Sequence, residues 1–356
     1  MSLPKFPKPL GSFSHELKER VHQYFETNNI ASTGNVQLYT KAIILPLIYI
    51  GLYVHLVFFT PPVVYAILEC ALMGLTVAAI GFNVMHDGGH GSFSNSPVLN
   101  RIAFFSLNIL GGSAFMWNMK HNVIHHAYTN IDGLDDDIDA KPFLRMSVTQ
   151  KKLGMHRYQH IYFWFLYSLL YMFWVFFSDF KKYFRRKVGD VPLKKMKAND
   201  HIIFWVSKVF FYFYIMVLPI YLLGFVPWLV GFLTLALTGG FVLSIVFQLA
   251  HTVEDASFPM PDEATHKMED EWTIHQLKTT ANFATRNKII CWYVGGLNFQ
   301  VEHHLFPKIS HVHYPAISRI VKQTCAEFGI GYIEYPKMVH AIASHVSYLK
   351  QVGKAR

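Results

Sequence analysis

The sequence has 356 residues, of which 52% are hydrophobic and only 15% are charged, and its mean hydropathy is positive. This composition excludes an ordinary soluble protein, which has about 25% charged residues, and indicates an integral membrane protein. The net charge of +9 favours attraction to anionic lipid headgroups and acidic partners, so no nucleic acid partner is expected.

Several apolar runs have about the 20 residues that a helix needs to cross the hydrocarbon core. They cover residues 41–59, 62–85, 160–178, 202–223 and 225–250, with a weaker run at 98–116. The N-terminal MSLPKFPKPL lacks the basic start, apolar core and cleavage site of a removable signal peptide. We therefore expect the first apolar run to anchor the chain.

Not all of these runs are predicted to cross the membrane. The chain has three histidine clusters, described below, that we interpret as one metal centre, and the ligands of one centre must lie on one side of the membrane. Residues 41–59 and 62–85 form one hairpin that returns the chain to the cytoplasm. The next segment, 98–116, must then stay at the interface, because a crossing there would separate the second histidine cluster from the first. The stretch 180–200 carries eight Lys or Arg residues and is predicted to be cytoplasmic by the positive-inside rule. Residues 160–178 are then interfacial as well.

The second hairpin consists of residues 202–223 and 225–250. The predicted fold class is an all-α integral membrane protein with four transmembrane helices in two hairpins and a cytoplasmic helical cap that carries the histidine clusters. We expect a cytoplasmic N-terminal segment (1–40), one catalytic unit (41–335) and a C-terminal tail (336–356), with both termini cytoplasmic.

Seven histidines fall in three tight clusters. They are His86 and His90 in HDGGH, His121, His125 and His126 in HNVIHH, and His303 and His304 in QVEHH. Imidazole is a common neutral metal ligand, and one zinc needs only about four ligands, so seven histidines indicate two metal ions. Because residues four apart share a helix face, the i, i+4 pairs of the first two clusters are expected to converge. His126 and His304, turned by about 100° from their neighbours, are expected to reach a second ion.

Polar residues at the end of the last span are further candidates. His251 lies where this span reaches the cytoplasm, in FQLAHTVED, and Gln248 shares its helical face. Polar groups at membrane depth are costly unless they are used, so His251 is predicted as an eighth metal ligand. Gln248, and Gln300 at the start of the third cluster, are candidate ligands that bind directly or through water.

The three clusters resemble the histidine boxes of the membrane-bound fatty acid desaturases. The boxes of that family read HxxxH or HxxxxH, HxxHH or HxxxHH, and HxxHH or QxxHH, matched here by 86–90, 121–126 and 300–304. Gln300 resembles the front-end subgroup, which introduces a double bond between an existing one and the carboxyl end, as in delta-6 and delta-5 enzymes. The segment GGLNFQVEHHLFPKISHVHYP is similar to bacterial and cyanobacterial desaturases of acyl-lipids or acyl-CoA.

The resemblance implies an oxygen-dependent enzyme of the bacterial inner membrane that forms a cis double bond in an acyl chain on lipid, CoA or carrier protein. Removing hydrogen from an unactivated methylene requires a redox-active metal, so two iron ions are expected rather than zinc, with O2 as co-substrate. The sequence contains no HPGG haem motif of a fused cytochrome b5 domain, and a separate ferredoxin or cytochrome b5-like donor is implied. Cys70, Cys291 and Cys325 stand singly and are expected to be ordinary reduced thiols.

Carboxylates near the boxes are expected to accept the free ring N–H of metal-binding histidines. Asp87, Glu302 and Asp255 are the main candidates. Asp135, Asp136, Asp137, Asp139 and Glu254 also lie near the boxes. The acyl chain is expected to occupy an apolar slot between the spans, where water is excluded.

Eight further histidines are predicted to be surface or interfacial residues. These are His15, His22, His156, His201, His266, His275, His340 and His345. For His311 and His313, in HVHYP after the third box, metal ligation and a structural role both stay open.

Two other functions remain open at this point. One is an oxygen-inserting enzyme of the same superfamily, a fatty acyl hydroxylase or alkane monooxygenase with the same metals. The other is a membrane metal transporter, which would place His and carboxylates within the spans rather than at one face.

Overall fold

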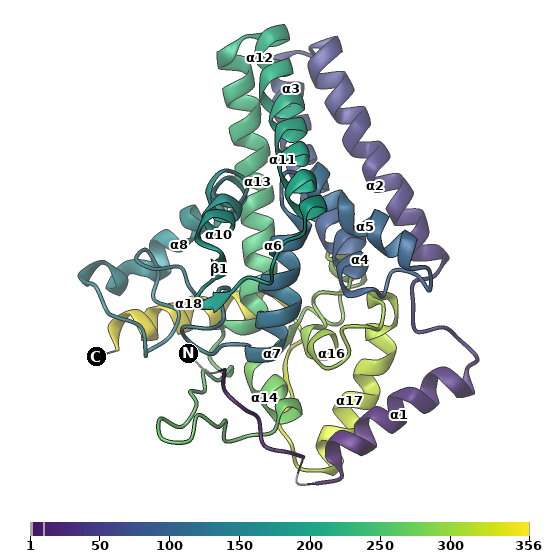
Figure 1. Cartoon of the computed structure of the whole chain (residues 1–356), viewed down its shortest axis with the longest axis vertical. Helices are drawn as coiled ribbons and strands as arrows, with labels where there is room; N and C mark the ends of the chain where they lie inside the picture. Colours follow the sequence, from purple (N-terminus) through teal and green to yellow (C-terminus); the bar gives the residue numbers. More distant parts are fainter. Residues whose placement is uncertain (1–2, 10, 356) are drawn as a thin grey trace.

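The computed structural model describes residues 3–9 and 11–355, and it is mostly helical (Figure 1). Long helices lie side by side in the upper part of the view, called the tower below. Under them lies a broader part, called the base, which contains both ends of the chain (Figure 1). Four of the helices are long and apolar enough to cross a membrane. They are Val36–Phe59, Val63–His90, Ala198–Leu223 and Phe225–His251, which agree with the four predicted spans.

Three of these four spans contain a π-helical turn. The first consists of α2 (Val36–Val54) and η1 (His55–Phe59), and the second of α3 (Val63–Ile80), η2 (Gly81–Met85) and α4 (His86–His90). The third consists of α11 (Ala198–Tyr212), η6 (Phe213–Val217) and α12 (Leu218–Leu223), and the fourth is the single helix α13 (Phe225–His251). Between α12 and α13 the chain reverses at Gly224, whose φ of 88° lies in the region that favours glycine.

Helices α3 and α13 approach each other closely because small residues meet at their crossing. A Cβ atom on Gly74 would lie 2.4 Å from the carbonyl oxygen of Leu235 and 3.1 Å from the amide nitrogen of Gly239. Small residues permit such backbone contact between membrane helices, where apolar lipid gives no hydrophobic driving force for association.

We expect Gly74→Ala to destabilise the protein by about 1–3 kcal/mol, because the new methyl group overpacks the crossing of α3 and α13. Gly51→Ala in α2 is the matched control, since a Cβ atom there meets nothing within 4 Å. Thermal unfolding in detergent measures the difference. Equal melting temperatures of the two variants would contradict the close packing of these helices.

The two predicted interfacial segments are both bent. Pro97–Ile109 (α5) turns by 110° into Ala114–Tyr128, and Gly154–Ser168 turns by 61° into Leu170–Arg185. Counting each bent pair as a further span would raise the number of candidate crossings from four to six. The elements of these pairs after α5 are α6 (Ala114–Asn118), η3 (Met119–His125), α7 (His126–Tyr128), η4 (Gly154–Tyr158), α8 (Gln159–Ser168), α9 (Leu170–Phe173), η5 (Trp174–Ser178) and α10 (Asp179–Arg185).

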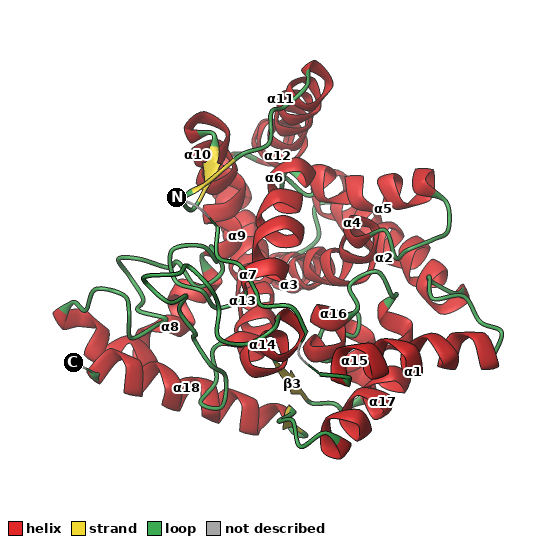
Figure 2. Cartoon of the chain, turned by 60° about the horizontal axis from the view of Figure 1, so that its bottom comes forward, coloured by secondary structure: helices red, strands yellow, loops and turns green. Residues whose placement is uncertain are grey.

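The base is built from the two ends of the chain, and Figure 2 shows it from below. Helix α1 (Phe13–Thr27) packs on α17 (Tyr314–Glu327) through Leu17, Val21 and Ile317, all of which are buried. The other base elements are α14 (Trp272–Thr279), α15 (Lys288–Tyr293), α16 (Gln300–Leu305), η7 (His311–His313), the antiparallel strands β1 (Lys187–Val188) and β2 (Val191–Pro192), and the parallel strands β3 (Ala281–Phe283) and β4 (Ile333–Tyr335).

The segment predicted as a C-terminal tail contains a long helix, α18 (Met338–Lys354), that packs against α8. Leu349 of this helix is fully buried, and the Arg145 guanidinium donates to the carbonyl oxygens of Val352 and Ala355. Most of the segment is therefore part of the folded base.

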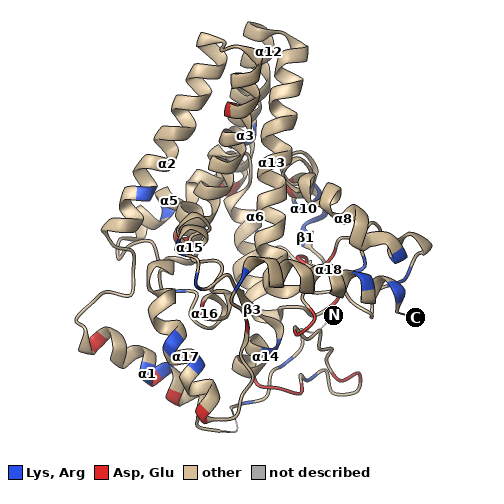
Figure 3. Cartoon of the chain, turned by 180° about the vertical axis from the view of Figure 1, so that it is seen from behind, with Lys and Arg blue, Asp and Glu red and all other residues tan. Residues whose placement is uncertain are grey.

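Charged residues gather in the base, whereas the upper part of the tower is almost free of them (Figure 3). An exception is Glu69 in α3, whose carboxylate lies 2.9 Å from the Nδ1 atom of His55 in η1. The charge distribution matches the apolar surface that lipid requires around the four long helices.

Candidate metal centre

Two π-helical turns arrange the first two histidine boxes. Turn η2 ends directly before His86, and η3 carries His121 and His125. A π-helix bonds residue i to residue i+5, which brings residues five apart together. His121 and His126, five apart, have their Nε2 atoms 3.2 Å from each other. Ordinary helical periodicity does not bring these two residues together, so this pair was not predicted from the sequence.

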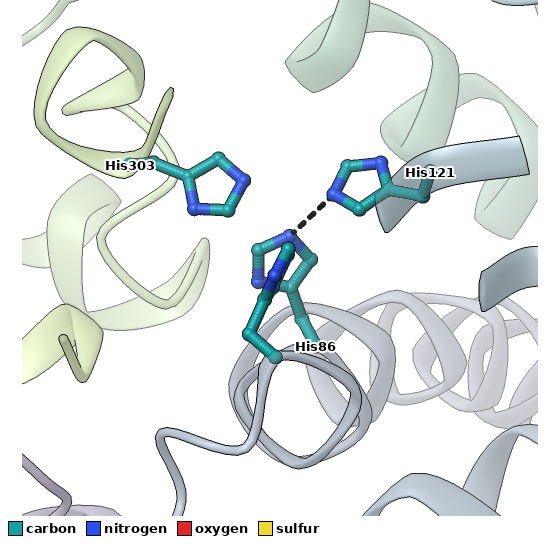
Figure 4. A group of neighbouring side chains, drawn as sticks. His86, His121 and His303 are labelled. Atoms are coloured by element: carbon teal, nitrogen blue, oxygen red, sulfur yellow. Dashed lines mark hydrogen bonds between the residues drawn. The ribbon is translucent and has the colours of Figure 1, made fainter. Parts of the chain in front are cut away.

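A first group consists of histidines from all three boxes. His86, His90, His121 and His303 each offer a nitrogen atom, and these atoms lie within 4.8 Å of one another. The Nε2 atoms of His86 and His121 are 3.3 Å apart (Figure 4). Figure 4 also shows His303 facing them from the opposite side. The first-box pair, His86 and His90, therefore lies in one group.

A second group lies next to the first. His125, His251 and His304 bring their ligand atoms within 4.8 Å of one another, and His126 does the same with His303 and His304. All eight predicted histidines therefore meet in two adjoining groups, with His126 between them. His121 and His125 also share a group with Asp137, but each belongs to a different histidine group.

The ring nitrogens of these histidines divide into a bound side and a free side. The Nδ1–H groups of His304 and His251 donate to Gln276 Oε1 at 2.8 Å and to the Thr279 carbonyl at 3.2 Å, and His303 Nδ1 lies 3.1 Å from the Tyr314 hydroxyl. Among the described residues, several buried Nε2 atoms have no hydrogen-bond partner. Within the two groups they belong to His90, His251, His303 and His304, whereas His126 has its Nδ1 atom unpartnered instead, and outside the groups His311 also has an unpartnered Nε2 atom. This arrangement fits metal ligands, whose second ring nitrogen is normally held by the protein.

His303 and His304 also favour the neutral state that a metal requires. Burial, with some contribution from neighbouring histidines, holds the pKa of His303 and His304 well below the usual value. The rings are therefore neutral near pH 7 and have a lone pair available.

Acidic residues after the second box orient His125. Its Nδ1 atom lies 3.1 Å from both carboxylate oxygens of Asp135 and 3.3 Å from Asp137. Lys120 in turn pairs with Asp137 at 2.6 Å. Such a carboxylate fixes the tautomer and orientation of a metal-binding histidine.

We expect Asp135→Asn to lower iron affinity or turnover by about 10–100-fold, because the amide loses the charge that orients His125. Asp132→Asn is the control, since Asp132 accepts from Thr149 and Gln150 and not from a box histidine. Iron content and desaturation are measured in both variants. Full iron content and turnover in Asp135→Asn would show that this contact is dispensable.

The three main carboxylate candidates have other hydrogen-bond partners. Asp87 binds His311 Nδ1 at 3.0 Å and the Ser310 hydroxyl at 2.6 Å, while exposed Asp255 accepts from Tyr335. Glu302 accepts from Asn282 and Tyr332, and burial raises its pKa to about 8. The remaining acids also bind elsewhere: Asp136 to Lys120 and Lys182, Asp139 to Lys141, and Glu254 to Ser347 and Gln351.

The two candidate glutamines lie in different surroundings. Gln248 donates to the Asp137 carbonyl and accepts from the Thr252 hydroxyl, both at 3.0 Å, so both ends of its amide are engaged. Gln300 is buried at the start of α16.

The prediction of a surface location is wrong for three histidines, His156, His275 and His345, all of which are at most 1% exposed. His275 Nε2 binds the Thr129 carbonyl, and His345 lies between the Tyr167 hydroxyl and the Thr252 carbonyl. Contacts between segments distant in sequence cover these side chains. His311 is also buried, and His313 is half-buried against the Thr33 carbonyl.

An apolar cavity leads away from the first histidine group. Its inner end is lined by His86 and Trp117, and it continues between the long helices to Val77 and Leu243. Its other lining residues are Gly81, Phe82, Met85, Leu107, Leu110, Gly112, Tyr171, Trp174, Val175 and Phe247. The cavity thus places apolar side chains directly beside His86.

Comparison with known proteins identifies the family. Residues 60–336 match the family model described as fatty acid desaturase. The chain belongs to the fatty acid desaturase family. An enzyme of Arthrospira platensis named sn-1 linoleoyl-lipid 6-desaturase is 36% identical over 98% of this chain and 94% of its own length.

Two other desaturases are similarly related. The sn-1 linoleoyl-lipid 6-desaturase of Synechocystis sp. is 36% identical over 99% of this chain and 98% of its own length. An acyl-lipid (8-3)-desaturase of Physcomitrium patens is 38% identical over 95% of this chain and 71% of its own length. The predicted resemblance to front-end desaturases is therefore confirmed. The chain is an oxidoreductase that desaturates fatty acyl chains, and the hydroxylase and transporter alternatives are not supported.

Proposed function

We propose that this desaturase acts on acyl chains esterified in membrane lipid and uses two iron ions held by eight histidines. The observation that carries the proposal is the pair of adjoining histidine groups, in which four buried Nε2 atoms have no hydrogen-bond partner within the described part of the chain. The names of the cyanobacterial relatives support a lipid substrate and a double bond near the carboxyl end.

The two groups suggest which residues hold each ion. His86, His90, His121 and His303 bind one iron, and His125, His251 and His304 bind the other, with His126 between them. Iron supplies the redox chemistry with O2 that removal of hydrogen from a methylene requires, whereas zinc does not. The Nδ1 atoms of three of these rings contact Asp135, Gln276 and Tyr314. These contacts orient the rings, so the centre is preorganised.

The apolar cavity beside His86 is the proposed acyl site. Its lining is almost entirely hydrophobic, so it accepts an alkyl chain and excludes water from the reacting methylenes. Trp117 packs at its inner end, with its ring stacked 4.3 Å from the ring of His121. Electrons come in this proposal from a separate ferredoxin or cytochrome b5-like protein.

A feeding experiment tests the proposed desaturase function directly. The chain is expressed in a host that is given defined unsaturated fatty acids, and new double bonds are located in the lipid-bound, CoA-bound and carrier-bound pools. We expect a new cis double bond on the carboxyl side of an existing one, appearing first in the lipid pool. First appearance in the CoA or carrier-bound pool would overturn the lipid substrate, and a hydroxylated product would overturn desaturation.

We further propose that only the four long helices cross the membrane, with the base and both termini in the cytoplasm. The basic stretch between α10 and α11 supports this orientation. The number of four crossings is supported by the position of the boxes. An even number of crossings between two boxes keeps the histidines on one side of the membrane, whereas an odd number would separate them. The bent segments are then interfacial, with exposed apolar side chains such as Ile102 and Phe165 facing lipid.

A cysteine at Lys195, which is exposed in the basic stretch, is expected to be protected from an impermeant thiol reagent added to intact cells. Val63 is 73% exposed and lies at the end of α3 that is far from the histidine boxes. A cysteine at this position is expected to react. Both substitutions are made in a chain whose three native cysteines are replaced. Reaction at position 195 from outside would refute the proposed orientation.

A further inference from the structure

A lysine is buried inside the third long helix. Lys208 is 1% exposed, and its Nζ atom lies 2.9 Å from Asp179 Oδ2, in a carboxylate that is also buried. The mechanism proposed above uses neither residue. A buried ion pair is weak evidence for stability, because desolvation offsets the attraction, and ionisable groups within membrane helices often serve function.

This ion pair is bonded to one wall of the acyl cavity. Lys208 Nζ donates to the Gly111 carbonyl at 2.6 Å, and Asp179 Oδ1 accepts from Trp174 Nε1 at 3.1 Å. Trp174 lines the cavity, as do Leu110 and Gly112, the two neighbours of Gly111. One ion pair thus fixes both the α5–α6 connection and the start of η5.

The wall is pressed against the helix that carries the lysine. Gly111 has a φ of 89°, and a Cβ atom on it would lie 2.6 Å from the ring of Phe211 in α11. Tyr212 of the same helix donates to the carbonyl of Val175, another lining residue, at 2.8 Å. Movement of Lys208 would therefore shift this wall.

The wall runs beside the path of the acyl chain. Val77 at the outer end and His86 at the inner end are nine residues apart along the second span, which corresponds to about 14 Å of helix. Leu110, at the end of α5, and Trp174 and Val175, in η5, line the same cavity. Their position affects how far an acyl chain can slide toward His86.

We propose that the Lys208–Asp179 pair is a positioning element that fixes this wall and so selects which methylene lies beside the metal centre. The inference rests on the proposed acyl site. Neither residue touches substrate, and both act through Trp174 and the Gly111–Gly112 connection. A displacement of about 1 Å is enough to change the rate of a positioned reaction strongly, so a shifted wall changes the ratio of products.

The test compares product positions in Asp179→Asn and Lys208→Met with those of the wild type. Each variant removes one partner of the pair. We expect positional selectivity, the ratio of the main double-bond isomer to all others, to fall by about tenfold, with iron content unchanged. Tyr53→Phe is the matched control, because it removes a part-buried hydrogen bond from the first span to the Tyr214 carbonyl of the third span, and neither residue lines the cavity.

The outcomes separate this inference from the proposed function. A wild-type chain that makes no double bond contradicts the proposed function. A wild type that desaturates, together with folded variants that form the same isomers at a lower rate, overturns the positioning role. If neither variant is recovered in membranes, Trp174→Phe decides, because it removes the indole N–H that binds Asp179, and an unchanged isomer ratio there overturns the proposal.

Discussion

His303→Ala is expected to abolish desaturation, with a loss of more than about 100-fold, because His303 belongs to two of the histidine groups. Its Nε2 atom is buried without a partner, and its Nδ1 atom is held by Tyr314. Removing this ring takes away a candidate ligand and leaves a cavity at a fully buried position. New double bonds in the host lipids and iron in the purified protein are measured together.

His340→Ala is the control for this experiment, since His340 is an exposed residue of α18. It is expected to behave as the wild type. His121→Ala should reproduce the loss, because the Nε2 atoms of His86 and His126 lie 3.3 and 3.2 Å from that of His121. Near-normal turnover in His303→Ala would contradict the assignment of the first metal position.

The second large effect is expected from His251→Ala. His251 lies outside the three boxes, at the end of α13, and shares a group with His125 and His304. Its Nδ1–H donates to the Thr279 carbonyl, which turns the free Nε2 atom toward that group. We expect desaturation to be lost as completely as for a box histidine, together with a fall in iron content.

The structure also shows which histidine is a suitable control for His251→Ala. From the sequence alone, His275 looks like a suitable unconstrained histidine, but it is buried against Thr129 and its ring packs on Phe6. Exposed His266 is the appropriate comparison. If His251→Ala keeps normal iron content and turnover, the eighth ligand lies elsewhere, and His311, whose buried Nε2 atom lacks a partner, is the next candidate.

The spans and the gathering of the box histidines were predictable because their signals are local. A run of about 20 apolar residues is readable in one window, and the boxes are short motifs whose residue type already indicates metal binding. His251 was predictable for a similar reason, since a polar residue ends an otherwise apolar helix. These predictions needed no knowledge of which segments meet.

Asp135 and Asp137, candidates from their place near the second box, contact His125, but the other partners of the histidines were not predictable from the sequence. Gln276 binds His304 from 28 positions away along the chain, and Thr279 binds His251 from the same separation. Asp87, next to His86 in sequence, points instead to His311, 224 positions away. Proximity in sequence was a poor guide for these acids because side chains on neighbouring helical positions point in different directions.

The pairing of His121 with His126 was missed for a local reason. The prediction used 3.6 residues per turn, whereas η3 is a π-helix, in which residues five apart come together. No residue in MKHNVIH signals this change by itself. The close spacing of rings that must share a buried volume becomes visible only when the three boxes are placed together.

Metal analysis of the purified full-length protein tests the central claim most directly. The chain is isolated from iron-replete cells, and iron and zinc are quantified against protein in the same sample used for turnover. The two adjoining histidine groups predict about two irons per chain. Stoichiometric zinc without iron, in protein that retains full desaturase activity, would contradict the account.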